Sequence, residues 1–151
     1  MGITTYTNTI KVGDKANTAL SRSEALGQLA VAQSALLSYT DAGSAIDVCT
    51  VPANSQIIDI YVDIYTAFNS SGTDLLDLGK STDSDHFAND LDLSSQARIL
   101  GSSDVSQLAN YDDIGTSQVT VQATYTQSVA DASAGSARIT VLYIPNNNLT
   151  A

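Results

Sequence analysis

The stretch that decides the fold of this chain is Val51-Pro52-Ala53-Asn54-Ser55-Gln56-Ile57-Ile58-Asp59-Ile60-Tyr61-Val62-Asp63-Ile64-Tyr65-Thr66-Ala67-Phe68. From position 58 its even positions are mostly apolar, whereas the odd positions up to 65 carry aspartates and tyrosines. A period of two kept over this length predicts a long β-strand with one buried and one more polar face. A helix would instead scatter the isoleucines around its surface. The apolar set is Ile58, Ile60, Val62, Ile64 and Phe68, and the polar set is Asp59, Tyr61, Asp63 and Tyr65.

The same alternation recurs between turn signals elsewhere in the chain. The loop 69–72 is short and contains a glycine, so strands 55–68 and 73–80 are expected to pair as a hairpin. Leu76 and Leu78 are expected on the buried face of the second of these strands. Further strands are expected at 28–40 (after a short helical turn at 20–26), 45–51, 97–100, 118–127 and 137–144, the last ended by Pro145.

The region from residue 81 to 116 has no clear strand pattern and is expected to be largely irregular. Ser84 or Asp85 is suited to cap one helical turn, which would bring Phe87 and Leu91 together four residues apart. In the loop 104–111, Val105 and Leu108 are expected to be the apolar anchors.

The number of strands and the absence of helix–strand alternation define the expected fold class. Seven or eight strands in a single 151-residue domain predict an all-β antiparallel sandwich, and the long crossover favours a jelly roll. Residues 1–17 are expected to form either a first strand, at 4–12, or an arm that orders only against a partner. Residues 18–145 form the expected sandwich domain, and 146–151 a polar tail.

The charge balance argues against two classes of partner. Sixteen acidic residues against six Lys and Arg give a formal net charge of −10, and the basic residues are dispersed. Nucleic acid needs a basic stripe to neutralise phosphate, so neither nucleic acid nor an anionic membrane is expected as a partner. No apolar run approaches the ~18 residues of a membrane span, and Met1 to Tyr6 do not resemble a signal peptide. Assembly in a cytosol is expected.

The single cysteine, Cys49, excludes an intramolecular disulfide and a cysteine-based zinc site. It lies in an alternating apolar segment and is expected to pack in or near the core.

The single histidine, His86, lies among several aspartates. Their spacing lacks the glycine and glutamate of an EF-hand, although a calcium site remains an alternative to a solvated acidic segment. A Ser-His-Asp triad would need a serine beside the ring, and the chain has no Gly-x-Ser-x-Gly motif. We therefore assign no catalytic, cofactor-binding or metal-ligating residue and do not expect an enzyme. The aspartates are Asp83, Asp85, Asp90 and Asp92.

Four polar residues of the strand expected at 55–68 form a second candidate site. Tyrosines and aspartates on one strand face are compatible with a carbohydrate-binding strip, but the favoured interpretation is the outer face of a sheet or a face buried in an oligomer. The absence of tryptophan argues against a stacked sugar platform. The strip is Asp59, Tyr61, Asp63 and Tyr65.

Several of these motifs occur together in one known group of proteins. With Val51-Pro52-Ala53-Asn54 and its strand, Thr66-Ala67-Phe68-Asn69, Leu76-Asp77-Leu78-Gly79 and Ser81-Thr82-Asp83-Ser84-Asp85, the chain resembles small virion proteins of tailed bacteriophages. The resemblance covers residues 45–92 well and 117–144 loosely, and residues 1–40 lie outside it. It implies a jelly-roll-like sandwich that decorates a capsid, often as a trimer.

The resemblance also implies partners and a location. It predicts a decoration or cement protein that binds the major capsid protein on the virion surface as a homotrimer, without a cofactor. The alternative is a carbohydrate- or surface-binding jelly-roll module of a tail or head fibre.

Overall fold

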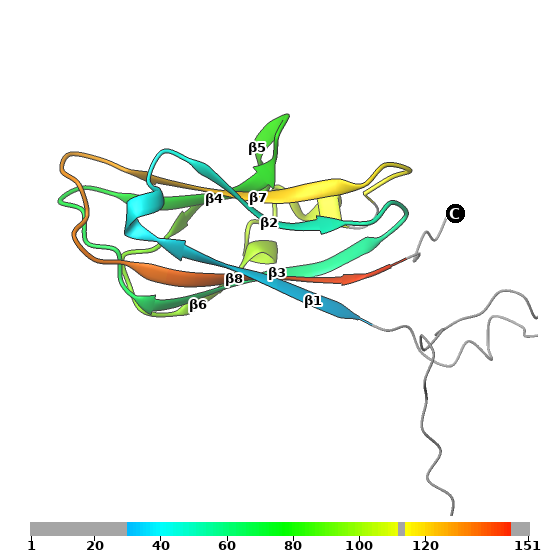
Figure 1. Cartoon of the computed structure of the whole chain (residues 1–151), viewed down its shortest axis with the longest axis horizontal. Helices are drawn as coiled ribbons and strands as arrows, with labels where there is room; N and C mark the ends of the chain where they lie inside the picture. The colour runs from blue at the N-terminus through cyan, green and yellow to red at the C-terminus, as the bar shows by residue number, and fades with distance from the viewer. Residues whose placement is uncertain (1–29, 112–113, 146–151) are drawn as a thin grey trace, which may run out of the picture.

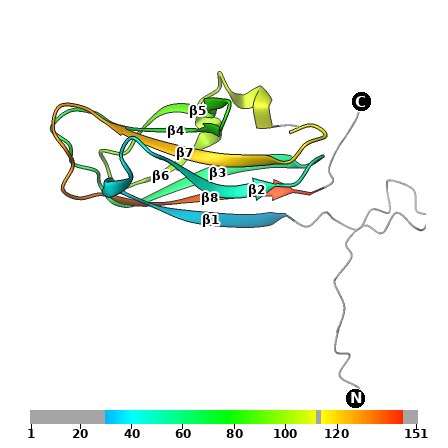
Figure 2. The same cartoon turned by 45° about the horizontal axis from the view of Figure 1, so that its top comes forward.

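Two four-stranded antiparallel sheets lie face to face in the computed structural model, which describes residues 30–111 and 114–145 (Figures 1 and 2). One sheet has the order β1-β8-β3-β6 and the other the order β2-β7-β4-β5. The strands are β1 (Val31–Ser38), β2 (Ala45–Val51), β3 (Gln56–Thr66), β4 (Asp74–Lys80), β5 (Asp83–Asp92), β6 (Arg98–Leu100), β7 (Val119–Gln127) and β8 (Ser136–Ile144). Within the described residues three short 3-10 helices join them: η2 (Tyr39–Asp41), η3 (Gly101–Ser103) and η4 (Leu108–Tyr111).

The strand pairing is that of a jelly roll. β1 pairs with β8, β2 with β7, β3 with β6 and β4 with β5, so the chain resembles one long hairpin whose arms run side by side. Rolling that hairpin adds the β3–β8 and β4–β7 pairs and produces the two sheets. The predicted all-β sandwich is therefore confirmed. No helix among the described residues is long and apolar enough to cross a membrane.

The core lies between the sheets and follows the alternation in the sequence. Ile60, Val62 and Ile64 of β3 are buried, as the period of two predicted. Leu76 and Leu78 of β4 are also buried, as expected. The closing strands β7 and β8 contribute the buried side chains Val121, Ala123, Tyr125, Ala137, Ile139, Val141 and Tyr143.

A bulge at the start of β3 makes one prediction wrong. The register with β8 shifts between Ile57 and Asp59, because β3 carries an extra residue there. An extra residue changes which face each side chain takes. Ile57 is consequently buried, whereas Ile58, expected in the core, is 41% exposed.

The predicted hairpin of 55–68 with 73–80 is also wrong, because β3 and β4 belong to different sheets. Between them the chain crosses the end of the sandwich, where the buried Phe68 ring lies 4.7 Å from that of Tyr125. The Phe68 N–H donates to the Leu93 carbonyl at 3.1 Å. Gly135 lies so close to Phe68 that a Cβ there would be 2.5 Å from the ring. The connection between β3 and β4 therefore passes from one sheet to the other with Phe68 buried, and it is not the short surface turn of a hairpin.

The acidic segment after β4 is a strand, not the predicted helical turn. β4 and β5 form the local hairpin, in which Lys80 pairs with Asp83. Asp90 has a φ of 54°, a left-handed conformation that aspartate tolerates better than most residues, and the register shifts on both sides of Leu78. Because aspartates are depleted in ordinary strands, the residue pattern of 83–92 does not predict a strand.

The expected anchors of the 104–111 loop are exposed, Val105 at 79% and Leu108 at 47%. Tyr111 is the buried residue instead, and its hydroxyl donates to the Phe87 carbonyl at 3.0 Å. Gly101 lies beside it, and a Cβ there would be 2.4 Å from the Tyr111 oxygen. Tyr111 at the end of the loop therefore anchors it to the core, in place of Val105 and Leu108.

The strands expected at 28–40 and 97–100 are confirmed in shorter form as β1 and β6, and 45–51 as β2. The helical turn expected at 20–26, the strand or arm at 4–12 and the tail at 146–151 lie outside the described residues.

A buried polar contact joins β4 to β7 at the same end of the sandwich as Phe68. The Tyr125 hydroxyl donates to Asp74 Oδ1 at 2.5 Å, and the Ser70 N–H donates to Asp74 Oδ2 at 3.0 Å. Asp74 is only 3% exposed, so its carboxylate relies on these donors in place of water.

We expect Tyr125→Phe to lower the free energy of unfolding by about 1.5–3 kcal/mol, because it leaves one oxygen of the buried Asp74 without its donor. Urea denaturation measures this loss. Tyr65→Phe is the matched control, since Tyr65 is 46% exposed and keeps its ring, and it should change stability little. Equal losses in the two variants would contradict the role given to the buried hydroxyl.

Candidate interaction surface

Positive charge is scarce on the described surface and is concentrated on one sheet. Of the sixteen acidic residues, only Asp14, Glu24, Asp112 and Asp113 lie outside the described ranges, which leaves twelve inside them. The described cations of the Lys and Arg type are Lys80, Arg98 and Arg138. Both arginines lie on the outer face of the β1-β8-β3-β6 sheet.

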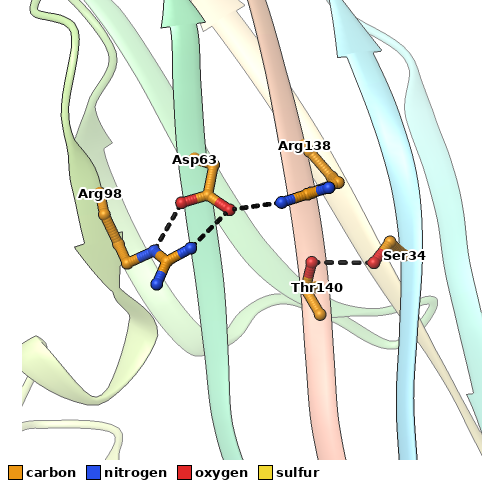
Figure 3. Close-up of polar contacts among 5 residues, drawn as sticks. All are labelled: Ser34, Asp63, Arg98, Arg138 and Thr140. Atoms are coloured by element: carbon orange, nitrogen blue, oxygen red, sulfur yellow. Dashed lines mark hydrogen bonds and ion pairs between the residues drawn. The ribbon is translucent and has the colours of Figure 1, made fainter.

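A carboxylate at the centre of this face holds both arginines. Arg98 on β6 donates from Nε to Asp63 Oδ1 at 2.5 Å and from Nη2 to Oδ2 at 3.1 Å. Arg138 on β8 donates from Nη2 to the same Oδ2 at 3.1 Å. Figure 3 shows the carboxylate between the two guanidinium groups, with the Thr140–Ser34 hydroxyl pair extending the polar contacts to β1. Polar side-chain contacts thus join β6 to β3, β3 to β8 and, separately, β8 to β1.

The rings of two tyrosines on β3, Tyr61 and Tyr65, lie beneath these guanidinium groups. The Arg98 guanidinium lies 5.5 Å from the centre of the Tyr61 ring, and that of Arg138 lies 5.6 Å from Tyr65. Both are cation–π distances. The Arg98 side chain is 62% exposed and that of Arg138 45%, so each keeps donors available to a partner.

Exposed apolar side chains surround this polar centre. Leu36 pairs in register with Arg138 and is 74% exposed, and Leu100 pairs with Tyr61 and is 39% exposed. Ile58 joins them because of the bulge in β3. Arginine and tyrosine among apolar side chains are enriched at protein interfaces. We call this surface the Arg–Tyr face, comprising Leu36, Ile58, Tyr61, Asp63, Tyr65, Arg98, Leu100 and Arg138.

The predicted tyrosine–aspartate strip is wrong in part. Asp59 is only 8% exposed and accepts hydrogen bonds from the Ser102 hydroxyl at 2.9 Å and from the Ile60 N–H at 2.8 Å. It therefore holds η3 against β3 and is not on the surface strip. Asp63 is engaged by arginines that lie 35 and 75 residues away in sequence, so the alternation in β3 gave no sign of them.

His86 does not form the triad considered from the sequence. Its Nδ1 lies 2.9 Å from Asp83 Oδ2 and its Nε2 lies 3.2 Å from Lys80 Nζ, so neither ring nitrogen is directed at a serine. Among the described residues, no group of three or more His, Cys, Asp or Glu side chains is placed to hold a metal ion.

Cys49 lies half-buried against the core, as expected. Burial raises the pKa of its thiol to about 11. The thiolate is the reactive form, so the raised pKa lowers the reactivity of Cys49 at neutral pH.

Comparison with known proteins gives matches by structure alone. No protein-family model and no curated protein matches the chain. A chain in the acidic stable capsid structure of Helicobacter pylori bacteriophage KHP30 is similar, with a TM-score of 0.55 and 13% identity over 78% of this chain and 89% of that one. A chain of the cyanophage Pam1 capsid asymmetric unit has a TM-score of 0.54 and 17% identity, over 80% and 87%.

Both structural neighbours come from phage capsids. They agree with the resemblance to phage virion proteins seen in the sequence. At this level of identity the similarity establishes the fold alone. It gives no information on whether the neighbours have a surface like the Arg–Tyr face.

The central ion pairs should make stability depend on pH in a defined way. The hydrogen bond from Arg98, with that from Arg138, holds the pKa of the Asp63 carboxyl below its usual range. A depressed folded-state pKa stabilises the fold above the ordinary carboxyl range, about pH 4, and this contribution is lost as pH falls through the depressed pKa. We expect Asp63→Asn to melt below wild type at neutral pH, with the difference shrinking in acid.

Thermal melts across the pH range measure that difference. Asp47→Asn is the control, because Asp47 accepts from the neutral amide of Gln122 at 2.7 Å. It should lower the melting temperature less at neutral pH. A difference for Asp63→Asn that stays constant or grows in acid would contradict the assignment.

The raised pKa of Cys49 predicts slow alkylation. At about pH 8 its thiolate fraction should be roughly two orders of magnitude below that of an unfolded cysteine. Iodoacetamide labelling of the folded protein should be slower than labelling in urea by at least that factor. Equal rates would show that the thiol is not buried in solution.

Proposed function

We propose that this chain is a structural protein of a bacteriophage capsid, a decoration or cement protein that binds the assembled major capsid protein and stabilises the shell. The homotrimer and the location on the capsid surface are part of this proposal, as is the absence of enzymatic activity. A role of this kind requires a stiff domain and an adhesive surface.

One observation carries the proposal. The jelly roll of this chain matches chains of two phage capsids over more than three-quarters of its own length and nearly all of theirs. A similarity of such extent relates the whole domain to capsid components.

The Arg–Tyr face is the surface we propose for the capsid contact. Eleven of the twelve described aspartates lie outside this face and make the rest of the described body acidic, whereas Arg98 and Arg138 present spare donors beside exposed apolar side chains. We infer that the capsid offers carboxylates interspersed with apolar residues there. Many copies on one shell would allow each contact to be weak.

The binding test uses virions of the phage that encodes this chain. We expect the protein in purified virions at a fixed copy number, measured by quantitative mass spectrometry. Stripped capsids should take it up again and release DNA at a higher temperature. If virions lack the protein and stripped capsids do not bind it, the proposed function is wrong.

Ile58→Asp tests the face itself. It adds a negative charge to the Arg–Tyr face at an exposed position and should reduce uptake by stripped capsids. Val129→Asp is the matched control: Val129 is 89% exposed, lies in the loop between β7 and β8, and should bind normally. Uptake unaffected by either change would place the capsid contact on another face while leaving the proposed function intact.

A further inference from the structure

The two sheets end in four edge strands, β1 and β6 in one and β2 and β5 in the other. An edge strand carries unpaired backbone groups and invites pairing with another chain, unless charge, a bulge or shortness prevents it. Three of the four edges have such protection. β6 is three residues long and includes Arg98, β2 has a bulge between Asp47 and Cys49, and β5 carries several aspartates and irregular register.

β1 has none of these protections. Its sequence, VAQSALLS, contains no charged residue and no proline. It pairs with β8 over eight consecutive residues without a shift in register, so it is a regular strand. Ala32, Gln33, Ser34 and Leu36 are exposed on it. Within the described residues its pairing partner is β8 on one side, and its other backbone edge is suited to receive a strand.

We propose that residues 4–12 of a neighbouring copy add to this edge as an extra strand. The inference rests on the proposed homotrimer. Direct pairing of β1 with β1 of a second copy joins two chains about a two-fold axis and ends there, so it cannot close a three-fold ring. Since the other three edges are protected against pairing, a segment outside the two sheets is the best occupant of this edge, and its donation would link each copy to the next.

The sequence of the N-terminal segment fits this role. Tyr6, Ile10 and Val12 share one parity, which is the pattern of a strand with one apolar face. The segment 4–12 is nine residues long, close to the eight of β1. Backbone hydrogen bonds would supply affinity and the apolar face would cover the half-buried Val31 and Ala35 at the margin of the core.

Charge also favours docking of the N-terminal segment on a sandwich. Residues 1–29 contain Lys11, Lys15 and Arg22 against Asp14 and Glu24, a formal charge of +1. Since the whole chain carries −10, the remainder carries −11. A weakly basic arm is therefore attracted to a strongly acidic body.

The connection between the segment and β1 favours a neighbouring copy over the same one. A hairpin within one chain would need residues 13–30 as its loop, eighteen residues where two to five are usual. The same eighteen residues reach about 60 Å when extended, enough to bridge to an adjacent body.

Hydrogen exchange of the β1 amides in the full-length protein tests the proposal. In an antiparallel pair alternate amides point away from the partner, so about half of those in β1 should be protected by the added strand. We expect their exchange to slow by roughly tenfold or more in the oligomer. The protection should disappear on dilution to the monomer, as followed by sedimentation.

Prolines in the arm provide the matched variants. Thr9→Pro and Ile10→Pro together cover both amide orientations, so at least one should abolish the protection. Neither position is in the described sandwich, so the fold should persist. Ser21→Pro, in the bridging stretch, should leave protection unchanged.

Two results would overturn the proposal: rapid exchange of all β1 edge amides at high concentration, or protection that persists in the monomer, which would mean that the strand comes from the same chain. Uptake by stripped capsids separates this from the proposed function. Wild type that binds capsids with an unprotected β1 edge removes only the strand exchange, whereas failure to bind removes the proposed function whatever the exchange shows.

Discussion

The rest of the structure depends on β3, whose inward side chains must be covered by a second sheet and flanked by neighbouring strands. Ile60, Val62 and Ile64 face the second sheet, and the flanking β8 lays its own apolar row beside them. Each such side chain contributes about 1.5–3 kcal/mol when fully buried. The second sheet packs Leu76, Leu78 and Val121 against them, and these side chains are equally buried from solvent. A long alternating strand therefore requires a sandwich, and the jelly-roll pairing supplies it.

Among the described residues, the two buried carboxylates lie where irregular segments meet the sheets. Asp74 binds the Tyr125 hydroxyl where the chain crosses between sheets, and Asp59 binds Ser102 where η3 returns to β3. Each carboxylate is matched with donors, so burial does not leave it unpaired. These contacts place the irregular segments that periodicity alone left undefined, and they leave the outer faces free for other roles.

The two surfaces that suggest function differ in kind. The Arg–Tyr face is a side-chain surface, in which charge and apolar area are combined on a chain that is otherwise acidic. The edge of β1 that has no partner strand among the described residues is a backbone surface, and its character comes from the absence of the charges and bulges that protect the other three edges. Under the proposed function, the first surface would bind the capsid shell and the second would join neighbouring copies.

Much of the fold was predictable from local pattern. The alternation in β3, β7 and β8 predicted strands and buried faces correctly, because side chains of a strand point to opposite sides whatever its partners are. The Asp-rich β5 was missed because aspartate disfavours strands and a bulge breaks the alternation. The alternation in β3 predicts the polar face around Tyr61 and Tyr65, but it gives no sign of Arg98 or Arg138, nor of the contact with Ser102 that covers Asp59.

The sequence by itself therefore determined that the chain is an all-β sandwich with its apolar rows inward. Only the tertiary structure decided which strands pair, where Phe68 crosses between sheets, and which carboxylate meets the arginines. The physical reason is range: the alternation of side chains is set between adjacent residues, whereas register, bulges and ion pairs arise between segments that meet only when the sheets close.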